Sequence, residues 1–343
     1  MNTLLLSDSQ KDIETAGEIL RNGGLVGIPT ETVYGLAANA LDGAAVRKIF
    51  EAKGRPMDNP LIVHIQDISE IRKFSLVREF PEKAEKLAEA YWSGPLTMIM
   101  PKGNAVPDEV SAGLDTVAIR FPEHKTAQRI IKAAGVPLAA PSANLSGSPS
   151  PTTAAHVMND MNGRIDAVVD GGECRVGLES TVITLVPKKP RLLRPGGITV
   201  EDIESVIGEI DIDDAVLNKL RDGEQAASPG MKYKHYAPKA RVVLIKGSDE
   251  AFADYVNSHS GKEVAALCYE EDKALTVPVF SLGKKGDYSS QAHLLFDSLR
   301  EIDKKGGLKL VYARCPETDG VGLAVYNRLI RAAGFEVIDL EKI

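Results

Sequence analysis

The sequence predicts an α/β protein with about two domains. Its 343 residues are enough for two domains that each bury a hydrophobic core. Short apolar runs typical of strands alternate with helical patterns, most regularly from Arg241 onward, which indicates a mostly parallel sheet there. Between Val26 and His64, two predicted strands end in polar and cationic residues. Ligands of open α/β sheets bind at strand ends, so we expect this stretch to form the mouth of a site.

The central stretch has a regular strand and helix pattern. An apolar run, Leu25–Ile28, predicts a buried strand that stops at a proline. The range Asp42–Ala52 predicts a helix, and Gly54 just past its end is a typical helix stop. Lys53 and Arg55 flank this glycine, which places two cations at a turn where backbone can approach a ligand closely.

The rest of the first part continues the alternation. A helix up to Leu20 has N-cap candidates in Ser7–Ser9, and Thr199 caps a helix that runs to Ile207. The segment Pro141–Ser150, rich in hydroxyls, glycine and proline, is expected to be a loop that presents backbone N–H groups. The other predicted helices are Ile68–Phe74, Pro81–Tyr91 and His124–Ala134, and the other predicted strands are Leu61–Ile65, Leu96–Met100, Val117–Phe121, Pro137–Ala140, Ala167–Asp170 and Thr181–Val186.

The composition changes near residue 210. A weakly patterned acidic segment and a Pro-Gly turn indicate a linker, which ends in a basic and aromatic run. We therefore predict a first domain over residues 1–210, a linker over 211–240 and a second α/β domain over 241–343. The elements predicted for the last are strands Val242–Ile245, Val264–Leu267, Val277–Ser281, Leu308–Ala313 and Glu336–Leu340, and helices Asp249–Ser258, Ser289–Asp303 and Val321–Ala333.

Composition and motifs exclude several classes of function. The net charge of −7 gives no overall cationic field for nucleic acid or anionic membrane, although a local basic pocket stays open. The sequence shows no signal-peptide pattern and no apolar run near the ~18 residues of a spanning helix, and we expect a cytoplasmic protein. Cys174, Cys268 and Cys315 indicate neither a disulfide framework nor a zinc site.

Common catalytic signatures are missing. The sequence has no G-x-x-x-x-G-K-[ST] loop, no G-x-G-x-x-G after a strand, no H-E-x-x-H and no G-x-S-x-G. An enzyme of this sequence would therefore build its site from scattered polar groups that position and neutralise charge. Transfer at phosphorus mostly needs such groups.

Four motifs in a fixed order carry a family resemblance. They are Pro29–Leu36 (PTETVYGL), Lys53–Arg55 (KGR), Ser142–Asn144 (SAN) and Ser228–Pro238 (SPGMKYKHYAP). Together they resemble the threonylcarbamoyl-AMP synthase family, of the type with two domains. The resemblance covers essentially the whole chain. It implies an N-terminal YrdC-like domain with an open, twisted α/β sheet and a small Rossmann-like C-terminal domain.

The resemblance also implies a reaction. Members of this family are nucleotidyltransferases that make threonylcarbamoyl-AMP and pyrophosphate from L-threonine, bicarbonate or carbon dioxide, and ATP. Mg²⁺ is expected to enter with ATP, held by its phosphates and by no protein side chain. Other proteins then transfer the threonylcarbamoyl group to the adenosine beside the anticodon, so tRNA is only an indirect partner. We expect a monomer that has no membrane partner.

Site residues follow from the resemblance, position by position. The expected catalytic residues are Lys53, Arg55, Ser142 and Asn144. The expected ATP contacts are Arg55, Asn59, Thr116, Ser142, Ser150, Arg194 and Tyr236. The expected threonine contacts are Thr32, His64, Arg120, Ala140 and Ser180. Arg120 is expected to grip the threonine carboxylate, and the linker with Tyr236 to fold over the nucleotide as a lid.

Most of these residues also have a purely structural interpretation. Thr32 could satisfy a turn, His64 could be a core histidine, and Arg120 could form a structural ion pair. Lys53 and Arg55 could complement the dipole of the preceding helix. The loop residues Ser142 and Asn144 could bond their own backbone, and the linker could be solvated. Thr116 and Ser150 fit this interpretation nearly as well as the functional one.

Two other functions compete with the synthase. One is a binding module for tRNA or double-stranded RNA, which the net charge of −7 disfavours. The other is a relative that handles a carbamoyl adenylate within a larger protein. The role of the C-terminal domain, selectivity against serine and the identity of the downstream proteins do not follow from the sequence.

Overall fold

The computed structural model describes residues 2–219 and 236–342, which form two compact units. The predicted linker lies largely in 220–235, outside the described residues. Most of the N-terminal half belongs to the first unit and most of the C-terminal third to the second. Two short segments from the first part of the chain, Gly147–Pro149 and Val176–Leu178, group with the second unit.

The first unit contains one mixed sheet in the order β1-β8-β2-β3-β7-β4-β6-β5-β9-β10-β11. Parallel and antiparallel pairs alternate irregularly across it. The predicted α/β class is confirmed. The strands are β1 (Leu4–Leu6), β2 (Val26–Ile28), β3 (Gly35–Asn39), β4 (Ile62–His64), β5 (Leu96–Pro101), β6 (Thr116–Arg120), β7 (Leu138–Ala139), β8 (Ala167–Val169), β9 (Thr181–Thr184), β10 (Arg191–Arg194) and β11 (Asp211–Ile212).

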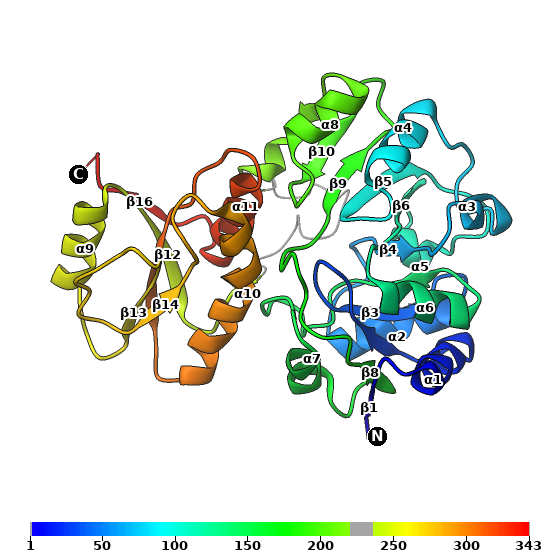
Figure 1. The fold of residues 1–343 in the computed structure, drawn as a ribbon, viewed down its shortest axis with the longest axis horizontal. Coiled ribbons are helices and arrows are strands. Elements are labelled where there is room, and N and C mark those ends of the chain that lie inside the picture. Colours follow the sequence, from blue (N-terminus) through cyan, green and yellow to red (C-terminus); the bar gives the residue numbers. More distant parts are fainter. Residues whose placement is uncertain (1, 220–235, 343) are drawn as a thin grey trace. The chain divides into compact units, whose positions relative to one another are not determined.

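Eight α-helices accompany this sheet in the described part of the first unit. Helices α1 and α6 pack together with β2 through Ile13, Leu20, Ile130 and Ile131, and a larger core contains residues of the other helices (Figure 1). The helices are α1 (Gln10–Arg21), α2 (Gly43–Lys53), α3 (Ser69–Lys73), α4 (Glu82–Tyr91), α5 (Asp108–Ser111), α6 (Lys125–Ala134), α7 (Ala154–Met161) and α8 (Val200–Ile207), followed by a 3₁₀ turn, η1 (Asp214–Val216).

Local sequence explains where these helices begin and end. Ser9 caps α1, and Thr199 caps α8 in a reciprocal capping box with Asp202. Helix α2 ends at Gly54, whose φ of 62° lies in the left-handed region that glycine adopts without strain. Pro81, expected in the first turn of a helix, is instead the N-cap of α4.

The second unit is a small sheet of five parallel strands in the order β14-β13-β15-β12-β16. Helix α9 covers one face, and α10 and α11 cover the other (Figure 1). The predicted parallel α/β unit is therefore confirmed. Its elements are β12 (Arg241–Lys246), α9 (Asp249–Ser258), β13 (Val264–Cys268), β14 (Val279–Ser281), α10 (Tyr288–Lys305), β15 (Leu310–Arg314), α11 (Gly322–Ala332) and β16 (Val337–Asp339).

Several elements were not predicted. Strand β3 has the sequence GLAAN, whose residues have low strand propensity, and it forms because it pairs with β2 and β7. Strand β1 is only three residues long and forms beside β8. Helices α5 and α7 span one and two turns, too short for a clear helical period. Among the described residues, no helix is both long and apolar enough to cross a membrane.

Gly196 lies where the turn after β10 touches the segment that leads into β9. A Cβ atom there would lie 2.3 Å from the backbone nitrogen of Thr181 and 2.7 Å from the carbonyl carbon of Ser180. Moving these backbone atoms to make room for a methyl group would cost free energy. We expect Gly196→Ala to lower the free energy of unfolding by about 1–3 kcal/mol, measured by urea unfolding with the fluorescence of Trp92. Gly261→Ala is the control, because its Cβ would meet only a Val264 methyl at 3.6 Å; equal stability of both variants would contradict the prediction.

Candidate active site

Two of the predicted site residues lie side by side on adjacent strands. His64 ends β4 and Arg120 ends β6, and the two residues are register partners in a parallel pair. On the other side of β6, Thr97 of β5 is the antiparallel partner of Arg120. Arg120 therefore sits between His64 and Thr97 in the sheet.

The expectation about strand ends needs a correction. Strand β4 is antiparallel to β2, because each step from β2 through β3 and β7 to β4 reverses direction. The carboxyl ends of the two strands therefore point in opposite directions and do not form one mouth. The side chain of Arg120 nevertheless contacts the loop after β2, so this loop must lie over the sheet.

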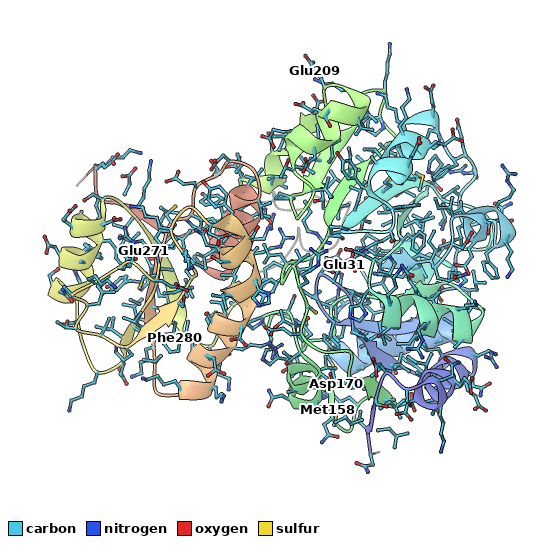
Figure 2. All side chains as sticks on the ribbon, in the orientation of Figure 1. Glu31, Met158, Asp170, Glu209, Glu271 and Phe280 are labelled. Carbon is cyan, nitrogen blue, oxygen red and sulfur yellow. The ribbon has the colours of Figure 1, made fainter. Side chains whose placement is uncertain are left out.

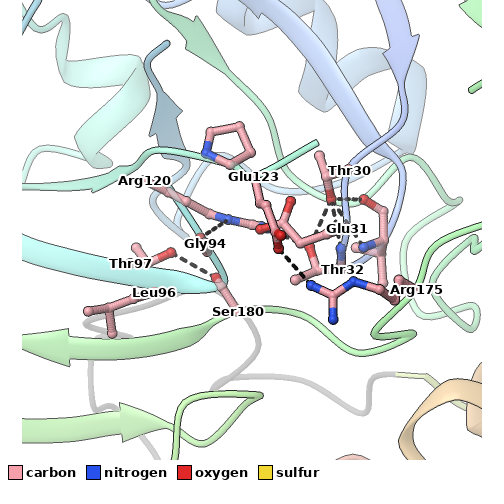
Figure 3. A network of polar contacts seen from close by, with 12 residues as sticks. Thr30, Glu31, Thr32, Gly94, Leu96, Thr97, Arg120, Glu123, Arg175 and Ser180 are labelled. Atoms are coloured by element: carbon pink, nitrogen blue, oxygen red, sulfur yellow. Dashed lines mark hydrogen bonds and ion pairs between the residues drawn. The ribbon is translucent and has the colours of Figure 1, made fainter. Parts of the chain in front are cut away.

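Arg120 connects this loop to the sheet. Its Nη1 donates to Oγ1 of Thr32 at 2.8 Å, its Nη2 donates to Oε1 of Glu31 at 2.6 Å, and its Nε donates to the carbonyl of Gly94 at 3.4 Å (Figure 3). A guanidinium has five N–H groups. Among the described residues, two of those on Arg120 thus have no partner, one on each terminal nitrogen. Such a pair can receive both oxygens of a carboxylate.

Glu31 is the counter-charge of Arg120. It lies in the interior of the first unit, 3% exposed, whereas Glu209 is on the surface (Figure 2). Burial disfavours its charged form, but the charge and hydrogen bond of Arg120 outweigh burial and lower the pKa of Glu31. Its Oε1 forms the ion pair, and its Oε2 is buried without a hydrogen-bond partner among the described residues.

Hydroxyl groups surround this ion pair. Thr30 Oγ1 donates to the carbonyl of Val33 and lies 2.9 Å from Oγ1 of Thr32, so the loop is fixed by its own side chains. Ser180 precedes β9 and lies 2.7 Å from Thr97, oxygen to oxygen. Its backbone carbonyl accepts a 3.0 Å bond from Arg194.

His64 is neutral at physiological pH. Burial and the nearby charge of Arg120 lower the pKa of His64 to about 3. Its Nδ1 lies 3.2 Å from the carbonyl of Ile62, which can only accept, so we assign the proton to Nδ1. Nε2 is then a hydrogen-bond acceptor.

Lys53 organises a second group of predicted residues. Its ammonium donates to the backbone carbonyls of Ser142 and Asn144, and its side chain is buried. The left-handed Gly54 ends α2 and lets the chain turn after Lys53. Lys53 therefore holds the predicted loop to the end of α2. Arg55 follows at this turn and donates to the carbonyl of Asn59 at 3.3 Å.

The other predicted residues are less closely grouped. Ala140 donates its backbone N–H to the carbonyl of Ile62, two residues before His64 in β4. Thr116 begins β6, at the end opposite Arg120. Ser150 is buried and donates to Glu179. Tyr236 belongs to the second unit, and the linker before it lies outside the described residues.

Sequence reasoning missed two members of the network. Glu31 stands inside a quoted motif but received no role, although a carboxylate between two threonines after an apolar strand is a signal of a buried partner. Thr97 is the one polar side chain in the run LTMIM, which is a similar signal. Within the described part of the chain, no group of three or more His, Cys, Asp or Glu residues could hold a metal ion.

The geometry defines an α/β protein with a buried polar site on a mixed sheet. Two family models match this chain and identify the family. A model described as "Telomere recombination" matches residues 18–196, and one described as "Threonylcarbamoyl-AMP synthase, C-terminal domain" matches 198–334. The chain belongs to the threonylcarbamoyl-AMP synthase family. The resemblance drawn from the four motifs is thus confirmed.

Relatives of nearly equal length agree. The chain is 47% identical to the threonylcarbamoyl-AMP synthase of Pyrococcus abyssi over 95% of both chains. It is also 47% identical to that of Bacillus subtilis, over 97% of this chain and 96% of the other. The crystal structure of P. abyssi Sua5 complexed with L-threonine matches with a TM-score of 0.91 and 45% identity, covering 99% of each chain.

Loss of the Glu31 charge should destabilise the first unit. Glu31→Gln leaves the buried Arg120 without its ion-pair partner, and we expect the free energy of unfolding to fall by about 3 kcal/mol in urea, followed by Trp92 fluorescence. Glu123→Gln is the matched control, because its pair with Arg175 is exposed on both sides and should be worth less than about 1 kcal/mol. Equal losses in the two variants would refute the argument.

His64 should make stability depend on pH. The unfolded chain protonates this histidine below about pH 6.5, whereas the native state does so only near pH 3, so stability falls as pH drops through this window. From pH 7.5 to 5 this contribution amounts to about 2 kcal/mol. His64→Gln should remove it in urea unfolding, and His259→Gln, an exposed control, should not. An unchanged pH dependence in His64→Gln would disprove the assignment.

Proposed function

We propose that this protein makes threonylcarbamoyl-AMP and pyrophosphate from L-threonine, bicarbonate or carbon dioxide, and ATP. The observation that carries the proposal is Arg120, a buried arginine whose charge is balanced by Glu31 while one N–H on each terminal nitrogen stays available. This arrangement suits the carboxylate of an amino acid, and the family to which the chain belongs supports threonine as that amino acid.

The neighbouring groups suit the rest of the threonine molecule. Hydroxyls of Thr32 and Ser180 can bond the substrate hydroxyl or carboxylate. The proposed contribution of Ala140 is its backbone carbonyl, because its N–H already donates to Ile62. The amine must be uncharged to react with carbon dioxide, and the neighbouring His64 is itself neutral, with Nε2 as an acceptor. Nε2 can accept a hydrogen bond from this amine.

The reaction then proceeds in two steps. The threonine nitrogen forms a bond to the carbon of carbon dioxide and releases a proton, which leaves a carbamate. A carbamate oxygen then attacks the α-phosphorus of ATP, and the bond between this phosphorus and the bridging oxygen to the β-phosphate breaks. Pyrophosphate leaves, and the mixed anhydride threonylcarbamoyl-AMP remains. Both reactants are anions, so cations that reduce their repulsion lower the barrier.

We assign that task to the residues around the end of α2. Lys53 holds the loop of Ser142 and Asn144 and contributes a buried positive charge, while Arg55 can reach the phosphates. Mg²⁺ enters as part of the ATP substrate. The further nucleotide contacts that we propose are Asn59, Thr116, Ser150, Arg194 and Tyr236.

The labile product must pass to other proteins, which transfer the threonylcarbamoyl group to tRNA. We propose that this protein itself meets tRNA only indirectly, acts as a monomer and works in the cytoplasm, where tRNA is modified. None of these steps needs a membrane.

Arg120→Lys tests the proposal. A lysine keeps the charge but loses the planar fork, so we expect the KM for L-threonine to rise about 10- to 100-fold while the KM for ATP changes less than about two-fold. The measurement is pyrophosphate release with Mg²⁺, ATP and bicarbonate, with and without L-threonine.

Arg175→Lys is the matched control for this measurement, because Arg175 is exposed and, among the described residues, pairs only with Glu123 at the surface. Its KM for threonine should equal that of the wild type. Pyrophosphate release by the wild type that is indifferent to threonine would refute the synthase. An unchanged KM in Arg120→Lys would refute the role given to Arg120.

A further inference from the structure

The second unit contains a cavity of about 390 Å³ to which the proposed reaction gives no role. It lies at the carboxyl ends of the parallel strands β12, β13 and β15. Gly247 and Ser248 line it after β12, Tyr269 after β13 and Arg314 at the end of β15, and Gln291 of α10 adds to the wall. All of these residues belong to one compact unit.

The strand order and the placement of the helices create a crevice at the carboxyl ends of β12 and β15. Strands β12 and β15 are neighbours, but α9 after β12 and α11 after β15 lie on opposite faces (Figure 1). The two connections therefore leave a crevice at the carboxyl ends of these two strands. Open α/β sheets bind their ligands in such crevices.

Arg314 is one of the residues that line the cavity, and all of its N–H groups donate to protein acceptors. Its five N–H groups donate to both carboxylate oxygens of Asp272, to Asp249 and, more weakly, to the carbonyls of Gly247 and Ser248. Its side chain is 4% exposed and stacks on Phe252 at 4.1 Å. Arg314 therefore fixes the loops around the cavity and keeps no donor for an anionic ligand.

Gln291, which lines the cavity, has a buried hydrogen-bond acceptor that lacks a donor among the described residues. The residue is 1% exposed, and its Nε2 donates to the carbonyl of Lys284 at 2.8 Å. Its Oε1 is buried and has no hydrogen-bond partner among the described residues. A buried acceptor without a donor costs about 1–3 kcal/mol, so this atom favours a ligand that donates.

The charges around the cavity favour the same kind of ligand. The lining contains three carboxylates, those of Asp249, Glu250 and Glu317. It contains two cations, Lys285 and Arg314. Lys285 already donates to both carboxylate oxygens of Asp249. Glu317 is exposed and has no ion pair in the described part of the chain. Helix α9 begins at the cavity, but its first turn already carries Asp249 and Glu250, which repel anions.

The turn between β14 and α10 completes one side of the cavity. Glu271, labelled in Figure 2, accepts the backbone N–H of Lys285 at 2.9 Å and holds this turn in place. Tyr269 and Tyr288 add aromatic surface to the wall. Aromatic faces attract ammonium and guanidinium groups.

We infer that this cavity binds a small organic cation, a compact molecule with an ammonium or guanidinium group. Its N–H groups would donate to Oε1 of Gln291 and to the carboxylate of Glu317, and the tyrosine rings would cover its carbon skeleton. The C-terminal unit is thereby a ligand-binding module whose ligand is distinct from the substrates of the proposed reaction.

The test uses the full chain and isothermal titration calorimetry. The cationic probes are putrescine and agmatine, and malonate is the anionic probe of similar size. We expect saturable binding of one equivalent of at least one cationic probe and no binding of malonate. In a ¹H–¹⁵N spectrum, the side-chain amide signal of Gln291 should shift when the binding cation is added.

Two variants locate the binding. Gln291→Leu removes the buried acceptor and should weaken the Kd of the cation about five- to ten-fold. Glu317→Gln, which alters only an exposed side chain and so should leave folding intact, should weaken it about two- to five-fold. Glu270→Gln is the matched control, because it removes an exposed carboxylate that does not line the cavity.

Three results would overturn the inference. The first is that neither putrescine nor agmatine binds the wild type, and the second is that malonate binds as tightly as they do. The third is that Glu317→Gln binds the cation as tightly as Glu270→Gln does. None of these measurements uses pyrophosphate release. A failure of this inference can therefore be distinguished from a failure of the proposed synthase activity.

Discussion

The buried ion pair of Arg120 and Glu31 is the constraint on which the first unit depends. Neither charge could stay in the interior alone, because an isolated buried charge costs several kcal/mol. The pair joins the end of β6 to the loop after β2, although the carboxyl ends of β2 and β4 point in opposite directions. Thr32 is therefore at the site because Arg120 holds the loop there.

Buried arginines serve different purposes in the two units. Arg314 has a protein partner for each of its five N–H groups, and these hydrogen bonds fix the surrounding loops. Arg120 has partners for three, which orient the guanidinium and leave one N–H on each terminal nitrogen. The same residue type thus belongs to the proposed carboxylate site in one unit and lines the proposed cation-binding cavity in the other. The number of satisfied donors decides between these outcomes.

Sequence patterns predicted the elements well but not the pairing of strands. Runs such as Leu61–Ile65 and caps such as Thr199 are local signals, and the structure places a strand and a helix start there. Strand direction depends on partners far away in the chain, so the antiparallel relation of β2 and β4 could not be read from either strand. The pairing of Glu31 with Arg120, 89 residues away, was hidden for the same reason.

The two proposed sites share one physical feature: each contains a residue with a buried polar atom that has no hydrogen-bond partner among the described residues. Among the described residues, Glu31 Oε2 and His124 Nδ1 are such atoms in the first unit, and Gln291 Oε1 is one in the second. Each costs stability, and a stable fold keeps few of them. Glu31 Oε2 lies on the carboxylate that orients Arg120, and Gln291 is one of the residues that line the cavity of the second unit. In the two proposed sites, a ligand that supplies a donor to such an atom would recover this free energy on binding, so an atom that weakens the free protein would strengthen its complex.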